Sequence, residues 1–226
     1  MSPDLTKVVS ILNDSSRAAI LDALMDGKPH PASELALVAK IKPQTASFHL
    51  TKMLDIGIID VERHGRHRYY KLINKEVAEL IESLYSVSPQ SKPKSFNQVH
   101  EYKQIHYART CYDHLAGYAG VQVTNALSQN GVLEKQSLDF VVTKSGVDFF
   151  KSLDIDVDLQ QSKRRSFARC CLDWSEREHH LAGALGNSLL ESMFNRNWIR
   201  RIPKTRAIEV TVEGKREMNE LLSIEL

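Results

Sequence analysis

The sequence has few cysteines and no long apolar segment. Three of its 226 residues are cysteine, too few for a disulfide scaffold, which indicates a reducing compartment such as the cytoplasm. No apolar run approaches the roughly 18–20 residues that a membrane-spanning helix needs. The first residues also lack the basic start and apolar stretch of a signal peptide. We therefore expect a cytoplasmic protein that does not enter a membrane.

Neither sign of charge dominates, and the common catalytic motifs are missing. The formal net charge is +2, so the positions of the charges say more about a nucleic-acid partner than their sum. The sequence lacks a Gly-rich phosphate loop, a nucleophile elbow and a His-Glu-x-x-His pattern. We predict no catalytic residues, and the chain is not expected to be an enzyme.

A segment poor in apolar residues divides the chain. Residues 86–95 contain two prolines and four serines but a single apolar residue, Val87. This composition is typical of a linker. We predict a first domain over residues 1–85 and a second over residues 96–226.

Short helical patterns fill most of the first domain. Leu21, Leu24 and Met25 have the i, i+3, i+4 spacing of a buried helix face. Residues 33–39 are expected to form a short helix. Residues 43–55 are expected to form another, since a proline occupies the first turn and a glycine lies just past the end.

Two β-prone runs follow these helices. Residues 58–62 and 69–73 flank an Arg- and His-rich segment that contains Gly65, a pattern that predicts a hairpin. A further amphipathic helix precedes the linker. Three helices, a hairpin and a closing helix are the order of a winged helix-turn-helix domain.

The helix at 43–55 has a polar side suited to the major groove of DNA. Gln pairs with adenine edges, Ser and Thr bond bases or phosphates, and Lys holds phosphate. The amides at the helix start add a phosphate site. The residues of this helix predicted to contact DNA are Gln44, Thr45, Ser47, Phe48, His49 and Lys52. The residues expected to pack against the preceding helices are Ala46, Leu50, Met53 and Leu54.

The tip of the predicted hairpin is strongly basic. Residues 63–71 include Arg63, Arg66, Arg68 and Lys71 and no acid. An Arg-rich wing lies along the DNA backbone or enters the minor groove. Alternatively, such charges keep an exposed hairpin edge from aggregating. Next to a polar helix face, the hairpin favours DNA binding.

Ordered segments of the first domain resemble the ArsR-type (arsenic-repressor-like) regulators. Residues 12–21 resemble their opening helix, residues 44–59 their recognition helix and the Gly-Ile-Ile that follows it, and residues 63–72 their wing. The resemblance covers about residues 5–85. It implies a homodimer, paired through its outer helices, on an inverted-repeat operator. It also implies repression that an inducer relieves.

Two metal sites of that family are expected to be absent. Many members bind metal through a Cys pair on the helix before the recognition helix, but residues 31–40 contain no cysteine. Others use Asp and His on the helix after the wing. Here that helix carries Glu76, Glu79 and Glu82 but no His, and we expect these carboxylates to be solvated.

The second domain repeats itself. Residues 108–113 are echoed by 168–173, and residues 114–117 by 180–183, with six extra residues between them in the second copy. An ancient duplication explains this pattern. We predict a mostly α protein with small β-hairpins (α+β), in which the second domain is helical and built from two repeated helix–hairpin–helix units.

The repeated Cys and His residues are a candidate effector or metal site. Cys111, His114, Cys171 and His180 carry thiol and imidazole groups, which are good ligands for zinc or copper. Cys170 and Cys171 are expected on a helix, where adjacent side chains point in different directions. Three interpretations remain open: buried structural residues, a thiol or metal sensor, and a pocket for an organic effector lined by aromatic residues such as Trp174.

The sequence as a whole predicts a DNA-binding regulator of transcription. We expect a homodimeric repressor whose partners are double-stranded DNA and an effector that the sequence does not identify. We expect no cofactor, and leave open whether the effector is a metal ion or a small molecule. The alternative is a winged-helix module for DNA packaging or protein interaction without a specific operator, because an Arg-rich wing also suits sequence-neutral binding.

Overall fold

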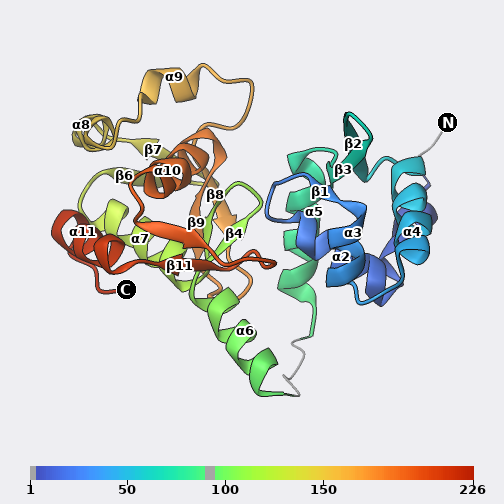
Figure 1. The fold of residues 1–226 in the computed structure, drawn as a ribbon. Coiled ribbons are helices and arrows are strands. Elements are labelled where there is room, and N and C mark those ends of the chain that lie inside the picture. Colours follow the sequence, from blue (N-terminus) through green and yellow to red (C-terminus); the bar gives the residue numbers. More distant parts are fainter. Residues whose placement is uncertain (1–3, 90–94) are drawn as a thin grey trace. The chain divides into compact units, whose positions relative to one another are not determined.

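The computed structural model describes residues 4–89 and 95–226 (Figure 1). The chain divides into two compact units, Met1–Glu82 and Ser83–Leu226, and each is described by itself. Helices and short antiparallel sheets build both units. No helix within the described ranges is long and apolar enough to cross a membrane.

The first unit is a winged helix-turn-helix. Its elements are α1 (Leu5–Leu12), α2 (Ser15–Leu24), β1 (His30–Pro31), α3 (Ala32–Val38), α4 (Pro43–Asp55), β2 (Ile59–His64), β3 (His67–Leu72) and most of α5 (Lys75–Val87). Asp14 begins α2 by accepting hydrogen bonds from the amides of Ser16 and Arg17. Leu24, Leu35 and Leu50 are fully buried where α2, α3 and α4 meet.

A short turn sets α4 against α3. Residues 39–42 connect the two helices, and Lys40 adopts a left-handed φ of 55°. Pro43 then begins α4, because its ring fixes a helical φ and its missing N–H has no partner in the first turn. The bounds predicted for this helix, residues 43–55, are those observed.

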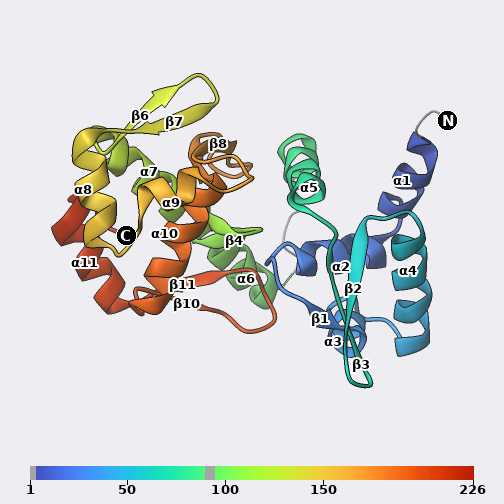
Figure 2. The same cartoon turned by 90° about the horizontal axis from the view of Figure 1, so that it is seen from above.

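The hairpin of β2 and β3 ends in a two-residue turn. His64 pairs with His67, so Gly65 and Arg66 form the tip, and Gly65 has a φ of 60° that favours glycine. β1 adds a third strand by pairing with β3, which gives the order β1-β3-β2. The hairpin projects beyond the helices (Figure 2).

The predicted linker is partly helical. α5 continues to Val87, so residues 86–87 belong to this helix rather than to a connection. Residues 90–94 lie outside the described residues. At the other end, Ser95 caps helix α6 by accepting a hydrogen bond from the Gln98 amide. The Ser- and Pro-rich composition therefore indicated the junction between the two domains. The end of α5, at Val87, extends two residues into the predicted linker.

The second unit contains the same series of elements twice. The first copy is α6 (Phe96–Tyr107), β4 (Arg109–Cys111), β5 (His114–Ala116), α7 (Gly117–Gln129), β6 (Leu133–Gln136), β7 (Asp139–Val142) and α8 (Lys144–Ser152). The second copy is α9 (Val157–Gln161), β8 (Arg169–Leu172), β9 (His179–Ala182), α10 (Gly183–Asn195), β10 (Ile199–Arg201), β11 (Ile208–Val210) and α11 (Val212–Leu222).

Each copy therefore holds two hairpins, where the sequence predicted one. Cys170 and Cys171 lie on strand β8, so the helix expected for them was wrong. The physical reason is length: β4, β5, β8 and β9 have three or four residues each, too few to display the alternation that identifies a strand.

The two copies exchange strand contacts in equivalent places. Asp139 of the first copy pairs with Arg169 of the second, and Ala207 of the second forms a bridge with Arg109 of the first. One of these contacts joins β6, β7, β8 and β9 into a four-stranded sheet. Both copies also contribute to one hydrophobic core, with Leu127 and Phe150 from the first and Leu190 and Ile208 from the second.

The last helix of each copy starts in the same way. Thr143 and Thr211 cap α8 and α11 by accepting hydrogen bonds from the amides of Gly146 and Gly214, both at 2.9 Å. A Cβ atom at either glycine would collide with a backbone carbonyl oxygen, that of Val132 for Gly146 and that of Trp198 for Gly214. These glycines therefore allow the helix starts to pack against the preceding chain.

We predict that Gly214→Ala destabilises the protein. An unobstructed Gly→Ala change inside a helix stabilises by about 0.5–1 kcal/mol, whereas overpacking costs about 1–3 kcal/mol. Urea denaturation of Gly214→Ala and Gly146→Ala measures the sign. Val147→Ala is the control, because the Val147 side chain is exposed. A stabilising effect at either glycine would contradict the close packing.

Candidate DNA-binding face and cysteine–histidine cluster

The polar side of α4 is open to solvent. Gln44, Thr45, Ser47, Phe48 and Lys52 are exposed, as the sequence predicted. Phe48 is 57% exposed, which is unusual for a large aromatic side chain, and the Lys52 ammonium lies 4.5 Å from the centre of its ring. This side of α4 therefore offers hydrogen-bonding groups, an apolar ring and a cation.

His49 does not belong to that face. It is 7% exposed, so the expectation that it lies on the exposed side of the helix is wrong, and a direct contact with DNA is not proposed for it. Its Nε2 atom lies 3.9 Å from an oxygen of Asp14, the residue that caps α2. His49 follows Ala46 by three residues and precedes Met53 by four, and both are fully buried. The helical period thus places the imidazole on the core side of α4.

The wing carries exposed arginines. Arg63, Arg66 and Arg68 are all exposed, and Arg63 lies directly opposite Arg68 across the hairpin. Within the described part of the chain these three guanidinium groups have no ion pair. Lys71, which the sequence grouped with them, is paired with Glu62 on the neighbouring strand. The arginines therefore supply the unneutralised charge of the wing.

The glutamates after the wing differ in their surroundings. Glu76 is exposed, and Glu79 lies 3.8 Å from the ammonium of Lys75. Glu82 is 5% exposed, so the expectation that all three are solvated was wrong for this residue. It lies one turn after Ala78 and next to Ile81, which are also buried on α5.

The structure brings the four repeated Cys and His residues together. Cys111 and His114 are directly opposite each other on β4 and β5, and Cys171 and His180 are opposite each other on β8 and β9. One ligand atom from each lies within 4.8 Å of the others. Strand pairing thus makes Cys171 and His180 neighbours although eight residues separate them in the sequence.

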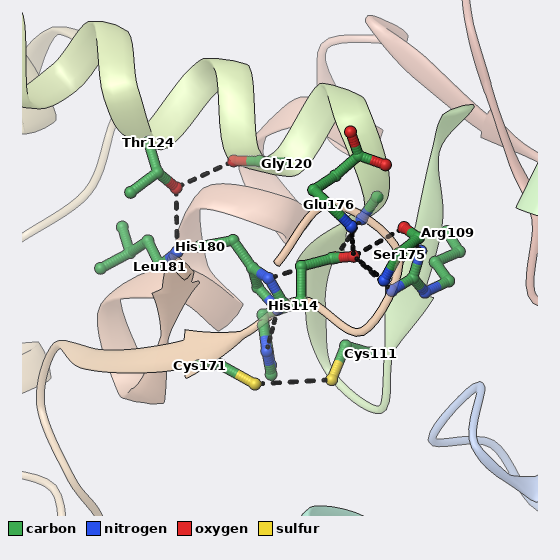
Figure 3. A network of polar contacts seen from close by, with 12 residues as sticks. Arg109, Cys111, His114, Gly120, Thr124, Cys171, Ser175, Glu176, His180 and Leu181 are labelled. Carbon is green, nitrogen blue, oxygen red and sulfur yellow. Dashed lines mark hydrogen bonds and ion pairs between the residues drawn. The ribbon is translucent and has the colours of Figure 1, made fainter. Parts of the chain in front are cut away.

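The two hairpins face one another across the cluster (Figure 3). The Sγ atoms of Cys111 and Cys171 are 3.9 Å apart, and the Nε2 atoms of His114 and His180 are 3.1 Å apart. Cys111, His114 and His180 are buried, while Cys171 is half-buried. The adjacent Cys170 points to the other face of its strand and takes no part.

Each histidine of the cluster lies beside an aspartate. An oxygen of Asp113 is 3.3 Å from His114 Nδ1, and an oxygen of Asp173 is 3.3 Å from His180 Nδ1. In both imidazoles the Nε2 atom is therefore left facing the partner histidine. The repeated sequence contains both aspartates, but nothing in it indicated that they orient the rings.

The aspartates are held in turn by arginines. Arg165 donates to Asp113 at 2.6 Å, and Arg109 donates to Asp173 at 2.9 Å. Arg109 and Asp173 both have fully buried side chains. Asp173 also accepts a hydrogen bond from the Gly117 amide at 2.7 Å. The cluster is therefore surrounded by a second layer of charged groups in fixed positions.

This layer shifts the pKa values of the groups inside it. Burial lowers the pKa of His114, but hydrogen bonds with Asp113 and Cys171 outweigh burial and raise it to about 9. The hydrogen bond from Cys111 is the largest effect that holds the pKa of Cys171 far below its usual range, and His114 and His180 act in the same direction. Cys170 differs, since burial raises the pKa of its thiol.

Trp174, Trp198 and Tyr118, three aromatic residues of the second unit, lie in different surroundings. Trp198 is 5% exposed and belongs to the hydrophobic core. Trp174 instead lies against the guanidinium of Arg109 at 4.3 Å and edge-on to His106. Tyr118 is partly exposed and stacks on Tyr107. These positions favour packing roles over a shared pocket.

Comparison with known proteins identifies relatives of the whole chain and of its first unit. A family model described as a helix-turn-helix domain matches residues 12–62. A protein of Bacillus subtilis, the uncharacterised HTH-type transcriptional regulator YdfF, is 54% identical over 226 residues, which cover all of both chains.

Two more distant relatives match about two fifths of this chain or less. The cadmium resistance transcriptional regulatory protein CadC of Listeria innocua is 26% identical over 81 residues, which are 36% of this chain and 68% of CadC. Among solved structures, the cadmium metal-sensor CMTR of Mycobacterium tuberculosis is 26% identical with a TM-score of 0.33, and the match covers 40% of this chain and 93% of CMTR.

We predict that Asp173→Asn strongly destabilises the second unit. The substitution leaves the Arg109 guanidinium buried without a compensating charge, which costs about 3–5 kcal/mol. Urea denaturation at neutral pH measures the loss. Arg216→Ala is the control, because Arg216 forms its ion pairs at an exposed position, where such pairs contribute little.

The Arg109–Asp173 ion pair also predicts that the stability of the second unit depends on pH. Burial raises the pKa of Asp173, but His180 and Arg109 outweigh burial and hold it below the ordinary value of 3.8. The ionised Asp173 therefore contributes fully to the free energy of unfolding at pH values above 3.8, and this contribution is lost as the pH falls below 3.8. The stability difference between the wild type and Asp173→Asn should shrink in acid. A constant difference would contradict the ion pair.

Proposed function

Because the chain belongs to the HTH-type transcriptional regulators and has an ArsR-like winged helix-turn-helix domain, we propose that it is a homodimeric repressor of an inverted-repeat operator. The exposed polar side of α4 is the observation that carries this proposal. Such regulators are typically not enzymes. The second unit, in this proposal, supports the dimer or receives the effector that releases the DNA.

The exposed residues of α4 match the groups that major-groove recognition requires. Gln44 offers both a donor and an acceptor for an adenine edge, and Thr45 and Ser47 offer hydroxyl groups. Phe48 supplies an exposed ring for the methyl group of thymine, and Lys52 a cation for phosphate. Pro43 and the uncapped start of α4 leave backbone amides open at the same end.

The wing has the electrostatics of a backbone anchor. Arg63 and Arg68 are directly opposite each other, and like charges in that arrangement destabilise a hairpin. A phosphate between or beside them removes the repulsion. Arg66 extends the positive charge to the tip of the hairpin. The proposed role of these three residues is to bind the sugar–phosphate backbone or the minor groove.

The outer helix α1 supports a dimer of this chain. Leu5 and Val9 are 71% and 52% exposed and lie on the same side of α1, four residues apart. A pair of exposed aliphatic side chains on a terminal helix suits burial against a second copy. An inverted repeat is the DNA sequence that such a twofold dimer would read.

The first test is selective binding to an operator. Fluorescence anisotropy compares the chain's own upstream promoter DNA with random DNA of equal length across a salt series. We expect a preference of about 10³ or more for the promoter, with a steep salt dependence. Equal affinity for both DNAs would instead support a packaging module without a specific operator.

The second test separates base recognition from backbone anchoring. Gln44→Ala should relax the preference at one operator position by about 1–3 kcal/mol, whereas Arg66→Ala should weaken binding to all DNA and reduce the salt slope by about one unit. His49→Leu should leave the sequence preference unchanged, because the imidazole is buried. Arg216→Ala, at an exposed position of the second unit, is the control. Equal losses on operator and random DNA after Gln44→Ala would rule out its reading role.

A further inference from the structure

We propose that Cys111, His114, Cys171 and His180 together bind one Zn²⁺ ion, or another tetrahedral ion that prefers thiolate and imidazole ligands. This inference stands on the geometry of the second unit and does not rest on the proposed function. The site lies outside residues 12–62, which the helix-turn-helix family model matches. It also differs in position from the helix before α4, where residues 31–40 contain no cysteine.

The distances within the cluster fit a tetrahedral ion. Zinc lies about 2.3 Å from sulfur and 2.0–2.1 Å from nitrogen in proteins. Tetrahedral angles then place two sulfurs about 3.8 Å apart and two nitrogens about 3.3 Å apart. The Sγ atoms are 3.9 Å apart and the Nε2 atoms 3.1 Å apart. These two spacings therefore match a tetrahedral ion, and the four ligand atoms, which all lie within 4.8 Å of one another, would draw together around it.

The aspartates prepare both imidazoles to bind a metal. Histidine ligands in metal sites donate the other ring N–H to a carboxylate or carbonyl, which fixes the tautomer and the ring orientation. Asp113 forms this hydrogen bond with His114 Nδ1 at 3.3 Å, whereas an oxygen of Asp173 lies 3.3 Å from His180 Nδ1 and needs a small adjustment to accept from it. Each Nε2 lone pair is then directed at the centre of the cluster. An aspartate beside Nδ1 and a free line from Nε2 to the other ligands are features of a metal-binding histidine rather than of one that only packs in the core.

The ligand set also selects the class of ion. Binding requires two thiolates and two neutral imidazoles, so the protons that the cluster carries leave to solvent, and the two thiolates balance the double positive charge of the ion. Two soft sulfurs and two imidazoles suit zinc and its relatives, while calcium and magnesium require oxygen ligands. Four protein ligands complete the tetrahedron, as in structural or sensing sites rather than catalytic ones.

The duplication explains why the four ligands converge. Each copy contributes one Cys and one His, placed opposite each other on its first hairpin. Two such hairpins that face one another supply a pair of sulfurs and a pair of nitrogens around a common centre (Figure 3). A bound ion would therefore tie the two copies together, and metal binding should raise the melting temperature of the full chain.

The experiment is a titration of the full chain with Co²⁺, a spectroscopic substitute for Zn²⁺, after reduction and removal of metal with a chelator. We expect the intense visible bands of tetrahedral Co²⁺ and thiolate charge-transfer bands, saturating at one ion per chain. Added Zn²⁺ should displace the Co²⁺ and abolish these bands. Zn²⁺ alone should raise the melting temperature.

Matched variants locate the ligands. Cys171→Ser and His180→Asn should lose the tetrahedral spectrum, while Cys170→Ser and His179→Asn should keep it, because these two neighbours point away from the cluster. Asp113→Asn, which removes no ligand, should bind Co²⁺ about 10–100-fold more weakly. Thermal unfolding of each metal-free variant establishes that it is folded.

Three results would overturn the site. The first is octahedral Co²⁺ without thiolate bands, and the second is an equal loss of binding in the Cys170→Ser control. The third is a reduced chain that takes up no Co²⁺ or Zn²⁺ but readily forms a Cys111–Cys171 disulfide on oxidation. That last outcome would identify the pair as a thiol switch, since the two sulfurs are already neighbours.

Discussion

The second unit depends on a buried ion pair between its two copies. Arg109 comes from the first copy and Asp173 from the second, and both side chains are completely buried. Separating them would leave two unpaired charges in the interior, at a cost of several kcal/mol each. The pair therefore favours packing arrangements of the two copies that keep Arg109 and Asp173 in contact. The observed arrangement sets β5 beside β9 and brings the two pairs of Cys and His together.

Both copies place an aspartate beside the histidine of the cluster, but they hold that aspartate in different ways. His114 directly follows Asp113, whereas residues 174–179 separate Asp173 from His180. In the second copy residues 174–178 form a loop, and the amides of Ser175 and Glu176 in this loop donate hydrogen bonds to Asp173. The first copy instead uses Arg165, from outside the repeated motif, to hold its aspartate. The two copies therefore supply equivalent ligands but hold them with different supports.

The sequence predicted the winged helix well because its signals are local. Pro43 and Gly57 bound α4, and Gly65 marks the two-residue turn of the wing. His49 was misplaced because polarity was taken to mean exposure, although its spacing from Ala46 and Met53 puts it in the core. The first hairpin of each copy was missed because strands of three or four residues show no periodicity.

The four residues of the cluster were identified from the repeated motif, although the secondary structure predicted for that motif was wrong. Internal repetition identified Cys111, His114, Cys171 and His180 as equivalent, which depends only on residue identity. Their convergence depends on strand pairing and on the packing of one copy against the other, which no local pattern encodes. The roles of Asp113 and Asp173 also required the structure, because an aspartate near a histidine in sequence is common and rarely orients a ring.

The same physical reasoning connects both candidate sites. A folded chain normally pairs its charges and fills its hydrogen bonds, so groups left without a partner mark positions where a ligand would supply one. On the wing, Arg63 faces Arg68 with no anion between them among the described residues. In the cluster, the two Nε2 atoms and the two Sγ atoms, all potential metal ligands, converge within 4.8 Å of one another. The arginines of the wing suit the binding of a polyanion, and the Cys–His cluster suits the binding of a divalent metal ion.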